Sequence, residues 1–153
     1  MSEDARLTRA AWREHEPDRL IGRGHPAGDF LEAWRWRVLE EREGFLRISV
    51  HVPEHVRNPR GQLFGGFTPT YVDLVALFTF RAGRREGRPR HWLVTTSMQV
   101  EYLAPVTEAE LVIESEVVAR RGRSAWIATR FLGPDGEPQV LARTVLRSAE
   151  PEL

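Results

Sequence analysis

Residues 58–80 read NPRGQLFGGFTPTYVDLVALFTF, and this stretch decides the fold. It opens on the turn dipeptide Asn58-Pro59 and passes through Gly65-Gly66 into a segment whose apolar residues recur at helical spacing. The opposite side of that segment is hardly more polar, so the pattern predicts a helix that is apolar on all sides. Such a helix, too short to cross a membrane, is expected in the centre of a protein core.

One ionisable residue, Asp73, lies in the middle of this predicted helix, and we expect it to be buried there. A buried carboxylate is costly unless it is paired, hydrogen-bonded or used in chemistry, which makes Asp73 the first candidate for function. Asp73 follows Gly66 by seven residues, nearly two turns, so the two share one helix face about 10 Å apart. If two such helices pack antiparallel across a two-fold axis, Asp73 of one chain meets Gly66 of the other. The spacing therefore predicts a site shared between subunits and an obligate dimer.

The composition excludes several classes of function. The 153 residues carry 22 basic and 22 acidic side chains, so no overall field favours nucleic acid or an anionic membrane. Every basic residue is Arg, which removes Schiff-base lysines and the P-loop lysine, and the chain has no Cys, which removes thiolate nucleophiles, disulfides and zinc-thiolate sites. The charged N-terminus lacks the apolar core of a secretion signal and no segment reaches membrane-spanning length, which predicts a cytoplasmic protein.

The other elements follow from hydrophobic alternation and turn signals. We expect a single domain made of an N-terminal helical extension and loop, a core, and a tail; these cover residues 1–32, 33–147 and 148–153. In order, the elements are a short helix at 4–21, a loop at 22–28, a hairpin of strands at 33–41 and 45–52, the central helix, and a meander of four strands at 92–103, 108–119, 123–132 and 138–147.

The expected fold class is therefore α+β. An antiparallel sheet of about six strands wraps around one long central helix, with a short N-terminal helix added, and this is the hot-dog arrangement. A sheet of six strands leaves an edge, which a small protein usually covers by pairing with a second copy.

Three stretches carry a family resemblance that covers about residues 33–147. The first is the pattern N-x-x-G-x-x-F-G-G at 58–66, followed by Asp73. The second is TTSMQVEYLAP at 95–105, and the third is ARRGRSAWIATRFLGPDGEPQVLAR at 119–143. Together they resemble the hot-dog acyl-CoA thioesterases of the phenylacetate-pathway and 4-hydroxybenzoyl-CoA type, in which the second stretch is the third strand and the third is the closing hairpin.

The resemblance implies hydrolysis of an acyl-CoA thioester to free acid and coenzyme A. Asp73 would act as general base on water or as nucleophile on the thioester, and the residues leave both roles open. The backbone N–H of Gly66, at the start of the helix, would hold the oxyanion, in line with the donors that a helix N-terminus offers. Asn58 would orient the water or the carbonyl.

In some members a hydroxyl on the third strand also positions the water. Counting back from Tyr102 selects Thr95, with Thr96 and Ser97 as near-equal candidates because the sequence does not fix which face of the strand points inward.

The resemblance also implies residues that contact the substrate. Gly65 and Ser97 would line the site, and Arg123, in the Gly-Arg turn, would meet the phosphates of coenzyme A, with Arg84 and Arg85 as further candidates. The sequence departs from the family at one position, where Phe64 replaces the usual His before the paired glycines. We interpret Phe64 as a change in the acyl pocket, with the core chemistry retained in Asp73 and Gly66.

Three other functions are compatible with parts of the sequence. The run HVPEH at 51–55 matches an inverted zinc-protease pattern, but Pro53 inside it argues against the helix that such a site needs, so we expect neither a metal nor another cofactor. A non-catalytic acyl-thioester binding protein and a hot-dog enoyl-thioester hydratase remain as alternatives, although hydratases usually employ a helix-borne His that the central helix lacks. The expected partners are acyl-CoA and further copies of the chain, as a dimer or a dimer of two dimers.

Overall fold

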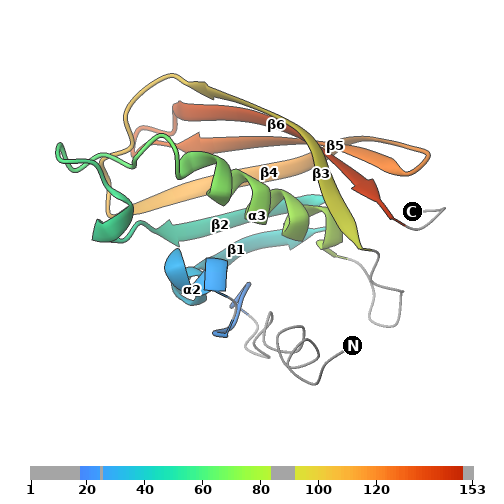
Figure 1. Ribbon diagram of the computed structural model, residues 1–153, viewed down its shortest axis with the longest axis horizontal. Coiled ribbons are helices and arrows are strands. Elements are labelled where there is room, and N and C mark those ends of the chain that lie inside the picture. The colour runs from blue at the N-terminus through green and yellow to red at the C-terminus, as the bar shows by residue number, and fades with distance from the viewer. Residues whose placement is uncertain (1–17, 25, 84–91, 150–153) are drawn as a thin grey trace.

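The computed structural model describes residues 18–24, 26–83 and 92–149 (Figure 1). Its elements are two α-helices, two short 3-10 helices and six strands. In chain order they are α2 (Pro26–Phe30), η1 (Ala33–Arg35), β1 (Arg37–Arg42), β2 (Phe45–His51), η2 (Glu54–Val56), α3 (Thr68–Arg81), β3 (Leu93–Tyr102), β4 (Glu110–Arg121), β5 (Ser124–Leu132) and β6 (Pro138–Ser148). The predicted α+β arrangement, a six-stranded antiparallel sheet around one long helix, is confirmed.

The strand order in the sheet is β1-β2-β4-β5-β6-β3, and every neighbouring pair is antiparallel. The predicted meander is correct for β4, β5 and β6 and wrong for β3, which pairs with β6 at the far edge. The reason is the helix that precedes it: α3 contacts β2, β4, β5, β6 and β3 and so carries the chain across the inner face of the sheet (Figure 1). The strand that follows α3, β3, therefore lies at the edge of the sheet opposite to the β1–β2 hairpin.

The main core lies between α3 and the inner face of the sheet. The Tyr71 ring on α3 stacks on Trp36, with ring centroids 5.7 Å apart, and meets Phe131 of β5 edge-on at 6.5 Å. Burial raises the pKa of the Tyr71 hydroxyl well above its ordinary value, with Arg57 acting in the opposite direction, so the phenol stays protonated. These large apolar contacts fix α3 on the sheet and hence fix whatever the helix presents to solvent.

The end of α3 is pinned against the β1–β2 hairpin. Gly83 has φ +65°, and a Cβ built there would lie 2.4 Å from the backbone nitrogen of Glu43, so only glycine fits on both grounds. The Gly44 N–H donates to the Ala82 carbonyl at 3.3 Å and joins the same two segments.

The N-terminal part of the chain differs from the prediction. The expected helix at 4–21 lies mostly outside the described residues, and its described end is not helical, since Arg19 forms a bridge with Arg37 instead. The predicted loop at 22–28 contains the start of α2. Strand β1 begins only at Arg37, because a 3-10 turn precedes it and turns the Trp36 side chain fully into the core.

Residues 84–91, between α3 and β3, and the end of the predicted tail fall outside the described residues. Within the ranges that the structure covers, no helix is long and apolar enough to cross a membrane.

Candidate active site

Asp73 and Thr95 are in direct contact. The Thr95 hydroxyl donates to Oδ1 of Asp73 at 2.5 Å, joining the middle of α3 to the edge strand β3. The prediction that Asp73 is buried is wrong for this chain, where the residue is exposed. The sheet covers only one side of α3, and Asp73 lies with Thr70 on the stripe that the sheet leaves open. The carboxylate is thus hydrogen-bonded and accessible at once.

A β-bulge decides which hydroxyl of β3 reaches the helix. Thr95 pairs with Leu146 and Ser97 with Val145, so Thr96 is the extra residue. Because a bulge shifts the alternation of side chains by one, Thr95 shares the inner face with the strand residues after the bulge that pack on the core, Met98 and Val100. The Thr96 hydroxyl is occupied with the Val145 carbonyl at 3.2 Å. Of the three candidate hydroxyls, the structure therefore brings Thr95, and neither Thr96 nor Ser97, to Asp73.

Gly65 and Gly66 form the turn that leads into α3. The Tyr102 hydroxyl, at the other end of β3, donates to the Gly65 carbonyl at 2.6 Å. The Gly66 N–H makes no hydrogen bond within the described part of the chain. A Cβ at Gly66 would lie 2.9 Å from the Phe64 ring, so that ring lies directly beside the free N–H. The turn presents an unoccupied backbone donor to solvent at the start of a helix.

The donor lies in the turn just before α3, and the carboxylate lies on the exposed stripe of the helix that follows. Edge strand β3 contacts both, through Tyr102 at the glycine turn and Thr95 at Asp73. Asp73 follows Gly66 by seven residues, of which the last six belong to α3, and this spacing corresponds to about 10 Å. A single carbonyl group cannot contact both within one chain.

Asn58 is engaged in its own loop. Its side-chain oxygen accepts the backbone N–H groups of Arg60 at 2.9 Å and Gln62 at 3.0 Å, and its amide donates to Oε1 of Gln62 at 3.2 Å. This is the turn-forming behaviour typical of Asn, so in this structure Asn58 shapes the approach to the glycine turn and its side chain does not reach Asp73.

Sequence reasoning missed the neighbouring Arg57, which holds the same loop in place. Its guanidinium donates to four backbone carbonyls at 2.7 to 3.1 Å: those of Val52, Gly61, Thr107 and Glu108. The side chain is almost fully buried, at 6 % exposure. No sequence signal distinguishes Arg57 from the other 21 arginines, because its partners are backbone groups brought together only by the fold.

The other predicted substrate contacts are scattered. Phe64 is exposed beside Gly66. Ser97 pairs with Val145 on the outer face of the sheet, away from α3, and so does not join Asp73. Arg123 lies in the β4–β5 turn, where its carbonyl accepts the Ser148 N–H at 2.8 Å. Because Ser148 pairs with Leu93, the turn lies at the same end of the sheet as the start of β3. Arg84 and Arg85 are outside the described residues.

The two histidines of the HVPEH run have separate partners. His51 Nδ1 lies 2.9 Å from Glu110 and its Nε2 lies 3.5 Å from Glu32, whereas His55 Nε2 donates to the Phe30 carbonyl at 2.5 Å. Among the residues that the structure describes, no three His, Asp or Glu side chains gather as a metal site would require.

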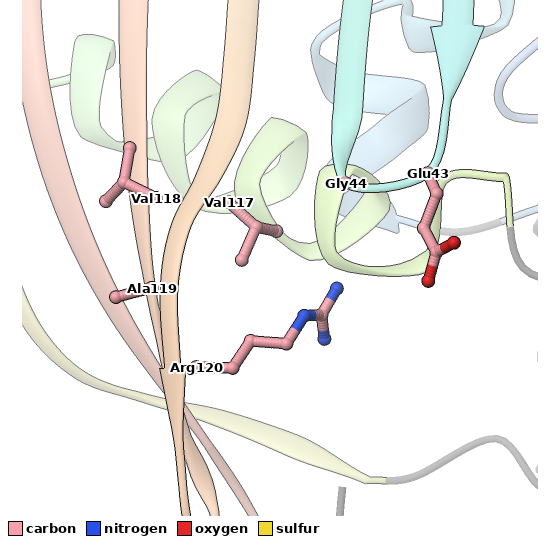
Figure 2. Close-up of a pocket in the computed structure, with 6 residues that line it drawn as sticks. All are labelled: Glu43, Gly44, Val117, Val118, Ala119 and Arg120. Carbon is pink, nitrogen blue, oxygen red and sulfur yellow. The ribbon is translucent and has the colours of Figure 1, made fainter.

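An open pocket of about 340 Å³ lies at the β1–β2 turn, next to the C-terminal end of α3 (Figure 2). Its lining comes from the turn residues Glu43 and Gly44 and from the end of β4, including Arg120, which extends toward Glu43 and lies over the Phe80 ring at 4.4 Å. Burial lowers the pKa of the Arg120 guanidinium, with Glu43 opposing the shift. The pocket contains none of the predicted site residues.

Comparison with known proteins places the chain in a family. The family model of the thioesterase superfamily matches residues 60–137, just over half of the chain, and this range includes Gly66, Asp73 and Thr95. No curated protein matches the chain.

Solved structures of thioesterases share the fold. A thioesterase from Haemophilus influenzae is 12 % identical, with 98 % of this chain and 92 % of that one covered and a TM-score of 0.69. A mutant thioesterase from Pseudomonas aeruginosa is 17 % identical (79 % and 84 % covered, TM-score 0.65). A hypothetical thioesterase protein from Streptococcus pneumoniae, solved with coenzyme A, is 15 % identical (78 % and 89 % covered, TM-score 0.64). With its six-stranded sheet, its central helix and the family match over residues 60–137, the chain belongs to the thioesterase superfamily and is a thioester hydrolase of the hot-dog fold.

Proposed function

We propose that the protein hydrolyses acyl-CoA thioesters to the free acid and coenzyme A. The observation that carries this proposal is the hydrogen bond from Thr95 to the exposed Asp73 carboxylate, on a helix that follows a glycine turn whose Gly66 N–H makes no hydrogen bond in the described part of the chain. The similar thioesterase from Streptococcus pneumoniae was solved with coenzyme A, which supports this choice of thiol.

The chemistry needs a carboxylate on one side of the thioester carbonyl and a donor for its oxygen. The Gly66 N–H binds the oxygen as negative charge develops, aided by the partial positive charge of the helix N-terminus. Asp73 either removes a proton from the attacking water or attacks the carbonyl carbon itself. In both routes the carbon–sulfur bond breaks and coenzyme A leaves as thiolate, which takes up a proton. In the first route the water oxygen is already bonded to the acyl carbon, and the free acid is the product. In the second route Asp73 is left joined to the acyl group as a mixed anhydride, which water hydrolyses to the free acid and the regenerated carboxylate. Thr95 holds the carboxylate in one orientation, and Asn58 shapes the loop before the glycine turn.

The separation of Gly66 and Asp73 makes the active unit a dimer. About 10 Å along one helix is too far for a single thioester, whereas two antiparallel helices related by a two-fold axis place Asp73 of one chain opposite Gly66 of the other. Edge strand β3 suits this assembly, because in the described part of the chain it pairs on one side only, with β6. Two copies of β3 side by side would join both sheets and both sites.

Released thiol, read with a disulfide reagent, tests this function directly. The assay has no background from the protein, which contains no cysteine. We expect turnover of acyl-CoAs by the wild type and a fall in kcat of at least about 1000-fold in Asp73→Asn, since the base or nucleophile is lost while the shape is kept. Glu116→Gln, which neutralises an exposed carboxylate on β4, is the matched control and should keep full activity. Tight acyl-CoA binding without turnover by the wild type would instead favour the binding protein.

Two expectations from the sequence accompany this proposal. We place the enzyme in the cytoplasm, and we propose that hydrolysis uses no metal or redox cofactor. Dialysis of the purified protein against a strong chelator should then leave kcat unchanged.

A further inference from the structure

The segment before residue 60 lies outside the matched family region, yet part of it is fixed beside the candidate site. Helix α2 (Pro26–Phe30) is tied down at both ends: the Gly24 N–H donates to both carboxylate oxygens of Asp29 at 3.1 Å, and the Leu31 N–H donates to the Ala27 carbonyl at 3.1 Å. The following Leu31 is fully buried. Phe30, between these anchors, therefore holds a defined position.

Phe30 is the first ring of an aromatic row that ends at the glycine turn. Its ring meets Phe67 at 5.5 Å between centroids, and Phe67 meets Phe64 at 5.7 Å. His55 supports the row from the other side, with its ring 4.8 Å from Phe30 and its Nε2–H on the Phe30 carbonyl. We call Phe30, Phe67 and Phe64 the aromatic row.

The row is unusually open to solvent for three phenylalanines. Phe30 is 45 % exposed and Phe64 51 %, while Phe67 between them is half-buried and packs on the core. Half-exposed rings in contact with one another form an apolar surface, and such a surface is expected to bind an apolar ligand or a partner protein. The surface is continuous with the candidate site, because the Phe64 ring lies beside Gly66 and its free N–H.

From this arrangement we infer that the aromatic row is the binding surface for the acyl group, and that Phe30, contributed by the N-terminal extension, is a specificity-determining residue. The inference rests on the proposed function. A thioester carbonyl held at the Gly66 N–H carries its acyl chain on one side of the carbon and sulfur on the other. The pantetheine arm next to the sulfur is rich in polar amide groups and matches three phenyl rings poorly, whereas an apolar acyl chain of several carbons, or one with a ring, gains both buried apolar area and ring contacts.

The inference selects substrates by the size of the acyl group. An acetyl group ends at the carbonyl and is too short to reach Phe30, two rings away from Gly66. Longer apolar acyl groups extend along the row, and their transition states lose contact area when Phe30 is truncated. Phe30 should therefore affect kcat/KM for large acyl groups and leave acetyl-CoA unaffected.

The test compares acetyl-CoA, hexanoyl-CoA and phenylacetyl-CoA in the wild type, Phe30→Ala and Phe30→Leu. We expect Phe30→Ala to lower kcat/KM about tenfold for hexanoyl-CoA and phenylacetyl-CoA and to change it less than about twofold for acetyl-CoA. Phe30→Leu should restore hexanoyl-CoA hydrolysis, since apolar area suffices for an alkyl chain. Leu39→Ala removes a side chain of similar exposure, 53 %, from edge strand β1 and should change none of the three values.

An equal fall for all three substrates in Phe30→Ala would overturn the inference, because it would mean that Phe30 only supports the fold. Unchanged values for all three would overturn it as well. Both results differ from failure of the proposed function, in which the wild type itself would release no thiol from any of the three.

Discussion

The two edges of the sheet are built differently. Strand β1 has four charged residues among six, a bulge at Leu39, and a chain segment across its start, where the Val38 N–H donates to the Asp18 carbonyl at 2.7 Å. Strand β3 has one charged residue among ten, and its exposed side chains include Val94, at 44 % exposure. Both edge strands contain a bulge, at Leu39 in β1 and at Thr96 in β3, so the difference lies in the charges and in the chain segment that covers the start of β1. Charges on an edge prevent pairing with other chains, so β1 is protected and β3 is left open to a partner.

This difference explains why the candidate site lies where it does. The open edge strand is also the one that supplies Thr95 to Asp73 and Tyr102 to the glycine turn. A partner that pairs with β3 therefore arrives directly next to both halves of the site. In our account, dimerisation and catalysis depend on the same strand, whereas β1 serves neither.

The largest expected effect comes from placing a charge on the open edge. Val94→Asp puts two carboxylates near one another across the proposed two-fold axis and should weaken dimerisation about 100-fold, with activity falling in parallel. Leu39→Asp makes the same change on the protected edge and should leave both unchanged. Sedimentation velocity across a concentration series, with kcat measured on the same samples, checks the pair. A fully active Val94→Asp monomer would contradict the role given to β3.

A smaller effect is expected inside β3, at two adjacent threonines. Thr95→Val removes the hydroxyl that holds Asp73 and should lower kcat about tenfold, while Thr95→Ser should keep it. Thr96→Val removes the hydroxyl bound to the Val145 carbonyl and should cost about 1 kcal/mol of folding free energy without changing kcat. Steady-state kinetics and urea unfolding of the three variants separate these outcomes. Equal kinetic effects at both positions would show that β3 as a whole, not the Thr95 hydroxyl, matters.

Much of this molecule could be predicted from sequence because local patterns decided it. Alternation gave the six strands to within about two residues for five of them. Helical spacing after Gly65-Gly66 located α3, and the family resemblance singled out the glycine turn, Asp73 and Thr95. The fold and the superfamily are confirmed, whereas the catalytic roles stay predictions.

The features that could not be predicted from the sequence depend on contacts between segments that are distant along the chain. Nothing in residues 92–103 shows that β3 pairs with β6 instead of β4, because the crossing direction of α3 decides it. The bulge at Thr96 likewise depends on the pairing of β3 with β6. Unless the bulge is known, the face of the strand on which the Thr95 side chain lies cannot be assigned. Burial of Asp73 was predicted from its apolar neighbours in sequence, but the sheet covers only one side of the helix. Asn58 was expected to orient the water or the carbonyl, whereas in the structure its side chain forms hydrogen bonds with residues of its own loop.

The central claim is that Asp73 of one chain and Gly66 of the other form one site, and mixing two inactive variants tests it most directly. Asp73→Asn lacks the carboxylate, and Gly66→Pro lacks the backbone N–H; circular dichroism and sedimentation confirm beforehand that each folds and dimerises. After denaturation and refolding together, half of the dimers are mixed, and each mixed dimer has one intact site if the site is shared. We predict recovery of about a quarter of wild-type activity in the mixture. No recovery, with mixed dimers shown to have formed, would mean that both residues act within one chain and would contradict the account.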